Sequence, residues 1–271
     1  MKIAITGANG RLGSELLKYD CKPIYADITH PSTLKKHISD INPDTIIHCA
    51  AITDVDGAED RLFKEVQRVN VIGTSCVRTA FGGQMIYLST DYVFDGQRGP
   101  YSETDKPNPV SVYGNSKYMG ERIIQENQNP LDIIVRTTIL YGNGTKYDFV
   151  KAILDKLHLG EHFTVPTTIF GTPTYVPHLA DAILQLCEMK FASRIVHIAG
   201  KDCISRYEFA KMIAEVFELD GSLIIPTKKI TGKAQRPKKA GLDTTLAKKI
   251  GLPIYSVKDG LEELRNAHIN V

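Results

Sequence analysis

Short apolar runs alternate with amphipathic segments along the first half of the chain. Five runs are nearly continuous in apolar residues, which is typical of strands that are buried on both faces of a sheet. These predicted strands are residues 2–6, 23–26, 45–48, 85–88 and 133–135. The amphipathic segments between them predict helices at residues 11–18, 31–40, 58–80 and 113–127. Repetition of strand and helix in this way predicts an α/β fold with a doubly wound parallel sheet.

The rhythm becomes irregular after residue 140, because prolines such as Pro166, Pro173 and Pro226 interrupt short apolar segments. We therefore expect residues 1–140 to form the core. Residues 141–271 are expected to form mainly a smaller C-terminal lobe, with some segments returning to the core. Two unrelated domains are not expected, since 271 residues lie near the upper limit of what one hydrophobic core supports.

Composition excludes several classes of protein. With 42% hydrophobic and 24% charged residues, the chain matches an ordinary globular protein and not a disordered one. No apolar run approaches the roughly 20 residues of a membrane helix, and the N-terminus lacks a secretory pattern. We therefore expect a cytoplasmic protein with no membrane partner. The five cysteines contain no Cys-x-x-Cys pair and the histidines lack metal-binding spacing, so neither a disulfide framework nor a metal site is predicted.

The positive charge of the chain is local. Residues 228–239 hold six basic residues and no acid, whereas the whole chain has a formal net charge of only +2. A nucleic-acid-binding protein is expected to carry a broader basic surface, so nucleic acid is not a predicted partner.

Three glycines follow the first predicted strand in the pattern Gly-x-x-Gly-x-x-Gly, at Gly7, Gly10 and Gly13. Glycine there permits a tight turn and lets the backbone approach a pyrophosphate, while the start of the next helix supplies unpaired N–H groups. Three glycines alone are equally compatible with a structural turn. Their position at the first strand–helix junction predicts a Rossmann-type, dinucleotide-binding sheet.

Two further patterns add a candidate proton-transfer site. Tyr113 and Lys117 are four residues apart on a predicted helix, so they share a face, and an ammonium favours the phenolate form of a nearby phenol. Ser89 and Thr90 end a predicted buried strand, which is where open parallel sheets bind their ligands. Each pattern alone has a purely structural explanation. Their order along the chain, after the glycine motif, favours a common functional site.

The chain resembles the extended short-chain dehydrogenases/reductases and, within them, the dTDP-4-dehydrorhamnose reductases. The specific matches are Ala-Ala-x-Thr-x-Val-Asp-x-Ala-Glu at residues 50–59 and Ser-Thr-Asp-Tyr-Val-Phe at residues 89–94. The glycine and Tyr-x-x-x-Lys motifs identify only the superfamily. The matches run through most of the chain, and Arg-Pro at residues 236–237 is among them.

The resemblance implies a role for each matching residue. Thr90 would hydrogen-bond a sugar ketone, Tyr113 would protonate its oxygen, and Lys117 would hold the nicotinamide ribose and tune Tyr113. The implied cofactor-binding residues are Gly7, Asn9, Gly10, Arg11, Leu12, Gly13, Asp27, Ile28, Ala50, Ala51, Thr53, Asn70, Tyr113 and Lys117. The implied substrate-binding residues are Asp91, Tyr92, Val93, Phe94, Ile139 and Arg236.

Two of these assignments have distinctive features. Ile139 follows Arg-Thr-Thr where the family usually has tryptophan, so the sugar contacts must differ there. Arg236 precedes a proline, which favours an extended backbone. Its guanidinium can bind the two oxygens of a diphosphate in a bidentate fork, whereas an exposed lysine such as Lys228 acts as a point charge.

The nicotinamide cofactor is expected to be NADP(H), with NAD(H) as the alternative. Asp27 lies 20 residues after Gly7, where an acid can bind the 2′-hydroxyl of the adenosine ribose and favour NAD. Alternatively, Asp27 meets the adenine edge and leaves Arg11 to receive the 2′-phosphate of NADP.

The activity implied by the resemblance is reduction of the C4 keto group of a nucleotide-linked 4-keto-6-deoxyhexose. The expected partner is therefore a nucleotide-sugar substrate, and a homodimer is one assembly that the resemblance leaves open. The enzymatic alternative is a nucleotide-sugar epimerase or dehydratase. An alternative from another class is a cofactor-binding regulatory subunit, like the beta subunit of methionine adenosyltransferase, which resembles this family.

Overall fold

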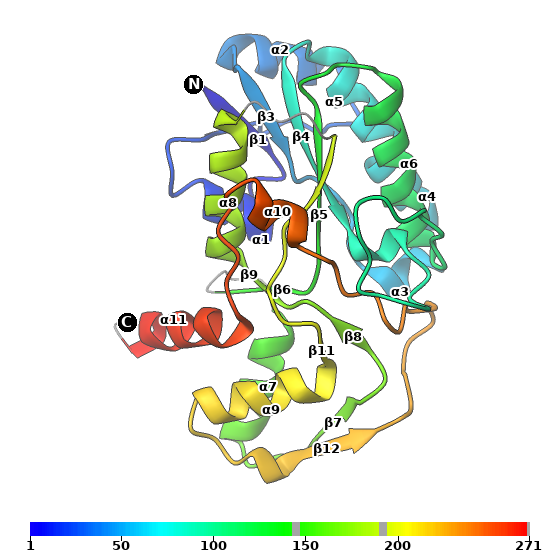
Figure 1. Ribbon diagram of the computed structural model, residues 1–271. Coiled ribbons are helices and arrows are strands. Elements are labelled where there is room, and N and C mark those ends of the chain that lie inside the picture. The colour runs from blue at the N-terminus through cyan, green and yellow to red at the C-terminus, as the bar shows by residue number, and fades with distance from the viewer. Residues whose placement is uncertain (143–146, 190–193, 270–271) are drawn as a thin grey trace.

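The computed structural model describes residues 1–142, 147–189 and 194–269. Six strands form one sheet in the order β10-β5-β4-β3-β1-β2, and every neighbouring pair is parallel (Figure 1). The strands are β1 (Ile3–Thr6), β2 (Lys22–Pro23), β3 (Thr45–His48), β4 (Gln84–Thr90), β5 (Ile133–Thr137) and β10 (Ile195–His197). The predicted parallel α/β sheet is confirmed.

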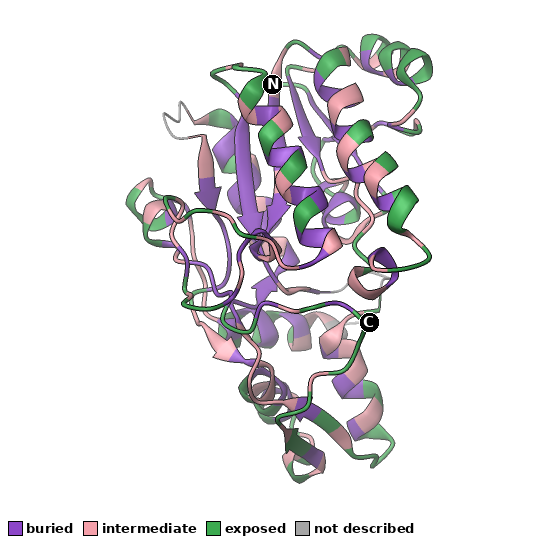
Figure 2. Ribbon diagram, turned by 90° about the vertical axis from the view of Figure 1, so that its right-hand side faces the viewer, coloured by how far each residue is buried: buried purple, intermediate pink, exposed green. Residues whose placement is uncertain are grey.

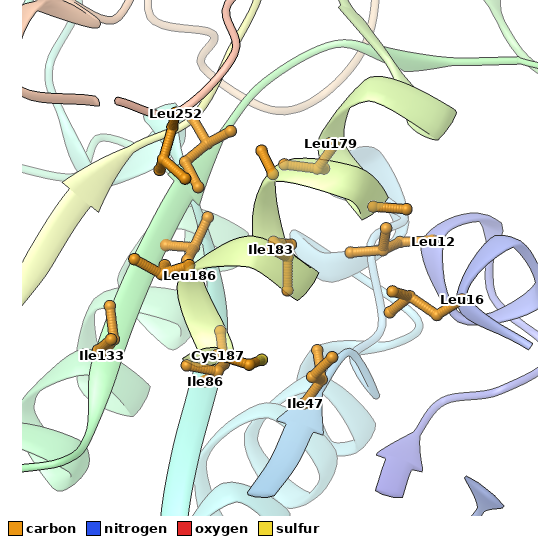
Figure 3. Close-up of a cluster of buried hydrophobic side chains, with 14 of the residues drawn as sticks. Leu12, Leu16, Ile47, Ile86, Ile133, Leu179, Ile183, Leu186, Cys187 and Leu252 are labelled. Atoms are coloured by element: carbon orange, nitrogen blue, oxygen red, sulfur yellow. The ribbon is translucent and has the colours of Figure 1, made fainter. Parts of the chain in front are cut away.

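One face of the sheet is covered by α1 (Arg11–Leu16) and α8 (Val176–Glu188). Figure 3 shows Leu12 and Leu16 of α1 and Ile183 of α8 with Ile47 and Ile86 of the sheet. Helix α8 and strand β10 lie in the second half of the sequence and nevertheless pack in the core of the sheet.

The opposite face of the sheet is covered by α2 (Pro31–Ile41), α5 (Thr74–Ala80) and α6 (Val112–Glu126). Neighbouring residues on a strand point to opposite faces, so Ile46 and Met85 pack here while Ile47 and Ile86 pack against α8. Figure 2 shows the resulting pattern, in which the strands are buried and the helices have exposed outer faces. Burial on both faces explains why the strands appear in the sequence as continuous apolar runs.

A second apolar cluster forms the core of the smaller lobe, in the lower part of Figure 1. It lies among α7 (Phe149–His158), α9 (Arg206–Val216) and α11 (Val257–Ile269). Three small sheets accompany it: β7 (Phe163–Pro166) with β12 (Ile224–Thr227), β8 (Phe170–Gly171) with β11 (Ile204–Ser205), and β6 (Leu140–Tyr141) with β9 (Thr174–Tyr175). The short helix α10 (Thr245–Lys249) packs against β10. None of the helices among the described residues could span a membrane.

Two predicted elements differ from the structure. The strand predicted at residues 23–26 ends earlier, at Pro23, after which Ile24 donates one more backbone bond to Ile5. Beyond that bond the chain leaves the sheet edge, and Tyr25 is 62% exposed. Proline lacks an N–H group, so it fits only such an edge position.

The single helix predicted at residues 58–80 is also wrong. The structure has α3 (Val55–Ala58), α4 (Phe63–Val66), a π-helix (Gln67–Gly73) and then α5. A π-helical turn is wider than an α-helical one and often occurs at functional sites. Here it contains the buried Asn70, whose side chain accepts a hydrogen bond from the backbone nitrogen of Ile52 in the loop after β3.

Candidate active site

One cleft lies at the carboxyl edge of the sheet and faces the smaller lobe. It encloses about 510 Å³ and is called the central cleft below. Many of the predicted site residues line it: Gly10, Arg11, Leu12, Gly13, Ala51, Thr53, Thr90, Asp91, Tyr92, Tyr113, Lys117 and Ile139. Val55 and Ser89, which belong to the two segments that match the family, line it as well. Further lining residues were not predicted as site residues: Cys49, Leu88, Thr137, Thr138, Leu140, Tyr147 and Arg206. The cleft therefore joins the glycine loop to the Tyr-x-x-x-Lys helix.

The glycine loop packs too closely for side chains at its first and last glycines. Gly7 has a φ of +70°, and a Cβ there would lie 2.6 Å from the backbone nitrogen of Ala50. A Cβ on Gly13 would lie 2.2 Å from the carbonyl oxygen of Gly7. Ala50 thus packs against the loop and does not line the cleft, whereas Ala51 lines it. Asn9 is exposed at the tip of the loop.

Thr90 ends β4 and caps the turn that follows it. Its hydroxyl accepts a hydrogen bond from the backbone nitrogen of Tyr92 at 3.3 Å and donates one to Asp91 at 3.1 Å. Burial raises the pKa of Asp91 to about 6, against the opposing effect of hydrogen bonds from Thr138 and Thr90. The site therefore contains a hydroxyl donor beside an acid that titrates near neutral pH.

Tyr113 lies in the first turn of α6, which begins after the capping residue Ser111. Gly114 lets this helix approach the 91–93 turn, since a Cβ there would lie 2.2 Å from the carbonyl oxygen of Tyr92. The rings of Tyr113 and Tyr92 meet edge to face at 5.6 Å. Burial raises the pKa of Tyr113 and a hydrogen bond with Thr90 opposes that rise, so the phenol is protonated at neutral pH.

Lys117 follows one turn later and is almost fully buried. Its ammonium lies 4.2 Å from the centre of the Tyr87 ring, and burial lowers its pKa to about 7. No residue in the described part of the chain accepts a hydrogen bond from this ammonium, although the side chain lines the cleft. A buried cation without an acceptor fits a site that receives hydroxyl groups of a cofactor.

Asn70 reaches the site indirectly. Its side-chain oxygen accepts from the backbone nitrogen of Ile52 at 2.8 Å, and its nitrogen donates to the carbonyl of Ile52 at 3.0 Å and to Ser116 at 2.9 Å. Ser116 lies between Tyr113 and Lys117 on α6. The side chain predicted to support the cofactor thus joins the loop after β3 to helix α6, and does not line the cleft.

Asp27 and Ile28 lie beyond the cleft, on the loop after β2. Asp27 accepts hydrogen bonds from the backbone and hydroxyl of Thr29, at 2.9 and 2.7 Å, and these lower its pKa to about 2. Its carboxylate also lies 3.5 Å from the guanidinium of Arg68, a residue that belongs to none of the sequence motifs. Ile28 is buried against Gly73, at the end of the π-helix.

Arg11 connects the glycine loop to the smaller lobe. Its guanidinium donates to the carboxylate of Asp148 at 2.8 Å and to the carbonyl oxygen of Tyr147 at 3.1 Å. Asp148 also caps the start of α7. The residue predicted to meet the 2′-phosphate thus makes an ion pair within the chain in this structure.

Three predicted substrate-binding residues do not line the central cleft. Val93 and Phe94 are fully buried behind it, where the Phe94 ring stacks on Tyr101 at 4.2 Å. Arg236 lines a separate cavity of about 580 Å³ beside the basic loop, which we define as residues 228–239. Ile139 does line the central cleft, and its φ of +47° is unusual for a β-branched residue.

The guanidinium of Arg236 forms a bidentate ion pair with a carboxylate of the chain itself. The two nitrogens lie 3.1 and 2.6 Å from the two oxygens of Asp56 in α3, and this pairing is the main reason why the pKa of Asp56 falls to about 2. Asp56 also accepts from the backbone nitrogen of Ala234 at 2.9 Å, and Lys233 pairs with Asp60. The basic loop is therefore attached to the sheet domain by ion pairs.

We expect this attachment to appear as coupling between Arg236 and Asp56. Arg236→Ala and Asp56→Ala should each destabilise the fold, with a coupling energy of about 1 kcal/mol because the pair is bidentate but partly exposed. Urea unfolding of the two single variants and the double variant measures this coupling. Lys228→Ala is the matched control, since this lysine is exposed on the same loop. Additive effects of the two substitutions would contradict the attachment.

The raised pKa of Asp91 predicts a pH effect on stability. Between about pH 4 and 6 the folded protein retains a proton that the unfolded chain releases, so the unfolding free energy falls as the pH rises. From pH 5 to 7.5 the wild type should lose about 1.4 kcal/mol that Asp91→Asn does not lose. Urea unfolding of both proteins at the two pH values tests this, with the exposed Asp40→Asn as control. A constant difference between Asp91→Asn and wild type would refute the raised pKa.

Metal chemistry finds no support in the side chains: within residues 1–142, 147–189 and 194–269, no three His, Cys, Asp or Glu residues gather as a candidate metal site. The buried His48 instead bonds Thr6 at 2.6 Å and Thr74 at 3.1 Å. Burial lowers its pKa to about 3, so it is a neutral core residue.

Comparison with known proteins places these features in one family. The RmlD substrate binding domain family matches residues 1–268. A dTDP-4-dehydrorhamnose reductase of Mycobacterium tuberculosis is 35% identical over 259 residues, which cover 88% of this chain and 82% of the relative. Methionine adenosyltransferase 2 subunit beta of Danio rerio is 31% identical over 281 residues, covering 94% and 86%.

A solved structure agrees with the sequence relatives. The dTDP-4-dehydrorhamnose reductase of Bacillus anthracis, in complex with NADP, has a TM-score of 0.92, with 34% identity over the full length of both chains. The predicted family resemblance is thus confirmed. Since the match spans the sheet domain and the smaller lobe alike, the chain belongs to the RmlD substrate binding domain family, which includes dTDP-4-dehydrorhamnose reductases.

Proposed function

We propose that this chain reduces the C4 keto group of dTDP-4-dehydrorhamnose with NADPH. The observation that carries the proposal is the shared cleft, in which Thr90, Tyr113 and Lys117 lie together with Gly10 and Gly13 of the glycine loop. A cofactor-binding loop beside a hydroxyl, a phenol and an ammonium suits reduction of a carbonyl group. The reductases among its relatives support the same activity.

The side chains divide the work of the reduction among them. The reduced nicotinamide supplies a hydride to the carbonyl carbon when it is bound. Tyr113 donates its proton to the carbonyl oxygen, a role for which its raised pKa keeps it protonated. Thr90 would turn its single O–H from Asp91 to the same oxygen and so stabilise the negative charge that develops there. Lys117 holds ribose hydroxyls of the cofactor with an ammonium that has no acceptor among the described residues.

NADP(H) is the cofactor that we propose, with NAD(H) as the alternative. The glycine loop would hold the pyrophosphate, and Arg11 lines the cleft beside that loop. The NADP complex of the Bacillus anthracis reductase supports this choice. Residues 1–140 would form the dinucleotide-binding core, and residues 141–271 mainly the substrate-binding lobe, with some segments returning to the core. Cytoplasmic location and homodimer formation stay predictions.

An absorbance assay at the NADPH wavelength tests the proposal. Freshly prepared dTDP-4-keto-6-deoxy sugar should cause net oxidation of NADPH in proportion to substrate consumed. A nucleotide-sugar epimerase or dehydratase would regenerate its cofactor within each turnover, so it would give product without net oxidation. That result would reject the reductase proposal.

The regulatory alternative deserves a direct test because methionine adenosyltransferase 2 subunit beta is similar over most of the chain. A regulatory subunit would bind NADP(H) without oxidising NADPH in the presence of the keto sugar. It would also change the kinetics of an added methionine adenosyltransferase catalytic subunit. Turnover by this chain alone, abolished in a variant of Tyr113, would favour the enzyme.

A further inference from the structure

A second arginine enters the central cleft from the smaller lobe. Arg206 is the first residue of α9, and its helix is fixed at this end by a capping box between Ser205 and Glu208. The backbone nitrogen of Arg206 donates to the carbonyl of Ile169 at 2.8 Å, so the start of the helix is held in place. In Figure 1, α9 lies below the sheet, on the side that its carboxyl edge faces.

The side chain of Arg206 lies on an aromatic ring and lines the cleft. Its guanidinium carbon is 5.0 Å from the centre of the Phe149 ring, which orients the planar group by a cation–π contact. Burial lowers the pKa of Arg206, and the positive charge of Arg236 adds to that effect, whereas Tyr92 and Asp91 favour the charged guanidinium. Thr90 and Tyr113 line the same cleft from the sheet domain.

No side chain or carbonyl in the described residues accepts a hydrogen bond from the Arg206 guanidinium. Asp91, the nearest candidate by charge, is instead hydrogen-bonded to Thr138 and Thr90. A guanidinium has five N–H donors and stays charged, and that of the partly exposed Arg206 is open to the cleft with no protein acceptor among the described residues. A ligand that brings anionic oxygens into the cleft would supply the missing acceptors.

The other cations near the site are placed differently. Arg11 pairs with Asp148 beside the glycine loop, and Lys117, one turn after Tyr113 on α6, lies over the Tyr87 ring. Arg236, the residue expected to grip the diphosphate, pairs with Asp56 and lines another cavity. Among the described residues, Arg206 is therefore the arginine that lines the cleft from the smaller lobe.

We propose that Arg206, and not Arg236, binds the diphosphate of the sugar nucleotide. The inference rests on the proposed function, because the keto group must lie at Thr90 and Tyr113 while the diphosphate extends toward the smaller lobe. A planar guanidinium suits this task, since it can offer two parallel N–H groups to two phosphate oxygens. Arg206 is thus a substrate-binding residue that sets the requirement for a charged nucleotide.

Ligand binding to the NADP-loaded protein tests Arg206 by calorimetry with dTDP and thymidine as probes. Arg206→Gln should weaken dTDP binding by about 10- to 100-fold, the scale of a lost charge-assisted hydrogen bond, and leave thymidine binding nearly unchanged. Arg206→Lys keeps the positive charge but not the planar fork, so it should lose less than Arg206→Gln. In rate measurements Arg206→Gln should raise KM for the sugar nucleotide more than it lowers kcat.

Three results would overturn the inference. Equal dTDP affinity in Arg206→Gln and wild type would show that the guanidinium does not meet the diphosphate. Equal losses of affinity for dTDP and for thymidine would show that Arg206 maintains the shape of the site and does not bind phosphate. A loss of dTDP affinity in Arg236→Gln but not in Arg206→Gln would show that the basic loop binds the diphosphate.

The binding experiment and the activity assay can fail independently. If no 4-keto sugar nucleotide is reduced but dTDP binding depends on Arg206, the proposed function is wrong and the role of Arg206 in diphosphate binding is supported. If reduction occurs but dTDP binding does not depend on Arg206, the proposed function is supported and the role of Arg206 is wrong. NADPH affinity, measured by fluorescence titration, should match wild type in Arg206→Gln; a parallel loss would assign the guanidinium to the cofactor and overturn the inference.

Discussion

Tyr113→Phe is expected to lower kcat by about 10²- to 10⁴-fold, the usual contribution of a positioned acid or base. The substitution removes only the hydroxyl and retains the ring that meets Tyr92 edge to face at 5.6 Å. The loss should therefore fall on the proton transfer and leave the shape of the cleft intact. Initial rates of NADPH oxidation at saturating sugar nucleotide measure the effect.

Cofactor binding separates this result from misfolding. Fluorescence titration should give Tyr113→Phe the same affinity for NADPH as the wild type, within about twofold. Tyr118→Phe is the matched control, because Tyr118 lies on the same helix and outside the cleft. Wild-type turnover in Tyr113→Phe, or an equal loss in Tyr118→Phe, would refute the role of Tyr113 as proton donor.

The sheet could be predicted because its strands are buried on both faces. Ile46 and Ile47 are both fully buried, one toward α2 and α5 and the other toward α8, so no polar position interrupts the run. The same reasoning misses β10, which lies in the irregular second half and has only two apolar residues, Ile195 and Val196, before His197. Short strands depend on their neighbours in the sheet more than on their own residues.

The π-helix within the predicted helix at residues 58–80 coincides with tertiary contacts. Asn70 lies in it and bonds Ile52 and Ser116, which are distant in the sequence. An amphipathic pattern reports which face of a helix is apolar and does not report such a bond. Helix propensity is weak enough that a few buried contacts override it.

In the candidate site, too, the sequence reveals local motifs but not contacts between residues that are far apart in the chain. The glycine loop and the Tyr113–Lys117 spacing are local patterns, and the structure brings both to one cleft. Arg236 pairs with Asp56, which is 180 residues away in the sequence. The sequence could therefore indicate Arg236 as a possible ligand-binding residue, but not the carboxylate with which it pairs. Arg206 belongs to no motif and becomes a candidate only through its position in the cleft.

A buried ion pair behind the site predicts the largest effect on stability. The carboxylate of Glu121 accepts hydrogen bonds from Arg136 at 2.8 and 2.7 Å and from Ser89 at 2.5 Å. Both charged side chains are only 1% exposed. Glu121 lies one turn after Lys117 on α6 and partly offsets the burial that lowers the pKa of that lysine to about 7.

Glu121→Gln should destabilise the protein by about 3–5 kcal/mol, because it leaves the Arg136 guanidinium buried without its counter-charge. Urea unfolding measures this loss. Glu126→Gln on the same helix is the matched control, since the Arg122–Glu126 pair is 50% and 64% exposed and should cost less than about 0.5 kcal/mol. Similar losses of unfolding free energy in both variants would show that burial does not increase the contribution of the Glu121–Arg136 pair to stability.

Two further measurements identify the cause of the loss. Replacing both partners with apolar residues, as Glu121→Leu with Arg136→Met, should recover much of the stability, because no uncompensated charge is left in the core. In Glu121→Gln the pKa of Lys117 should fall further, since the carboxylate that favours the ammonium is gone. The alkaline limb of kcat/KM should then move to lower pH. If the double variant is no more stable than Glu121→Gln and the limb does not move, Glu121 contributes packing to α6 and neither balances Arg136 nor tunes Lys117.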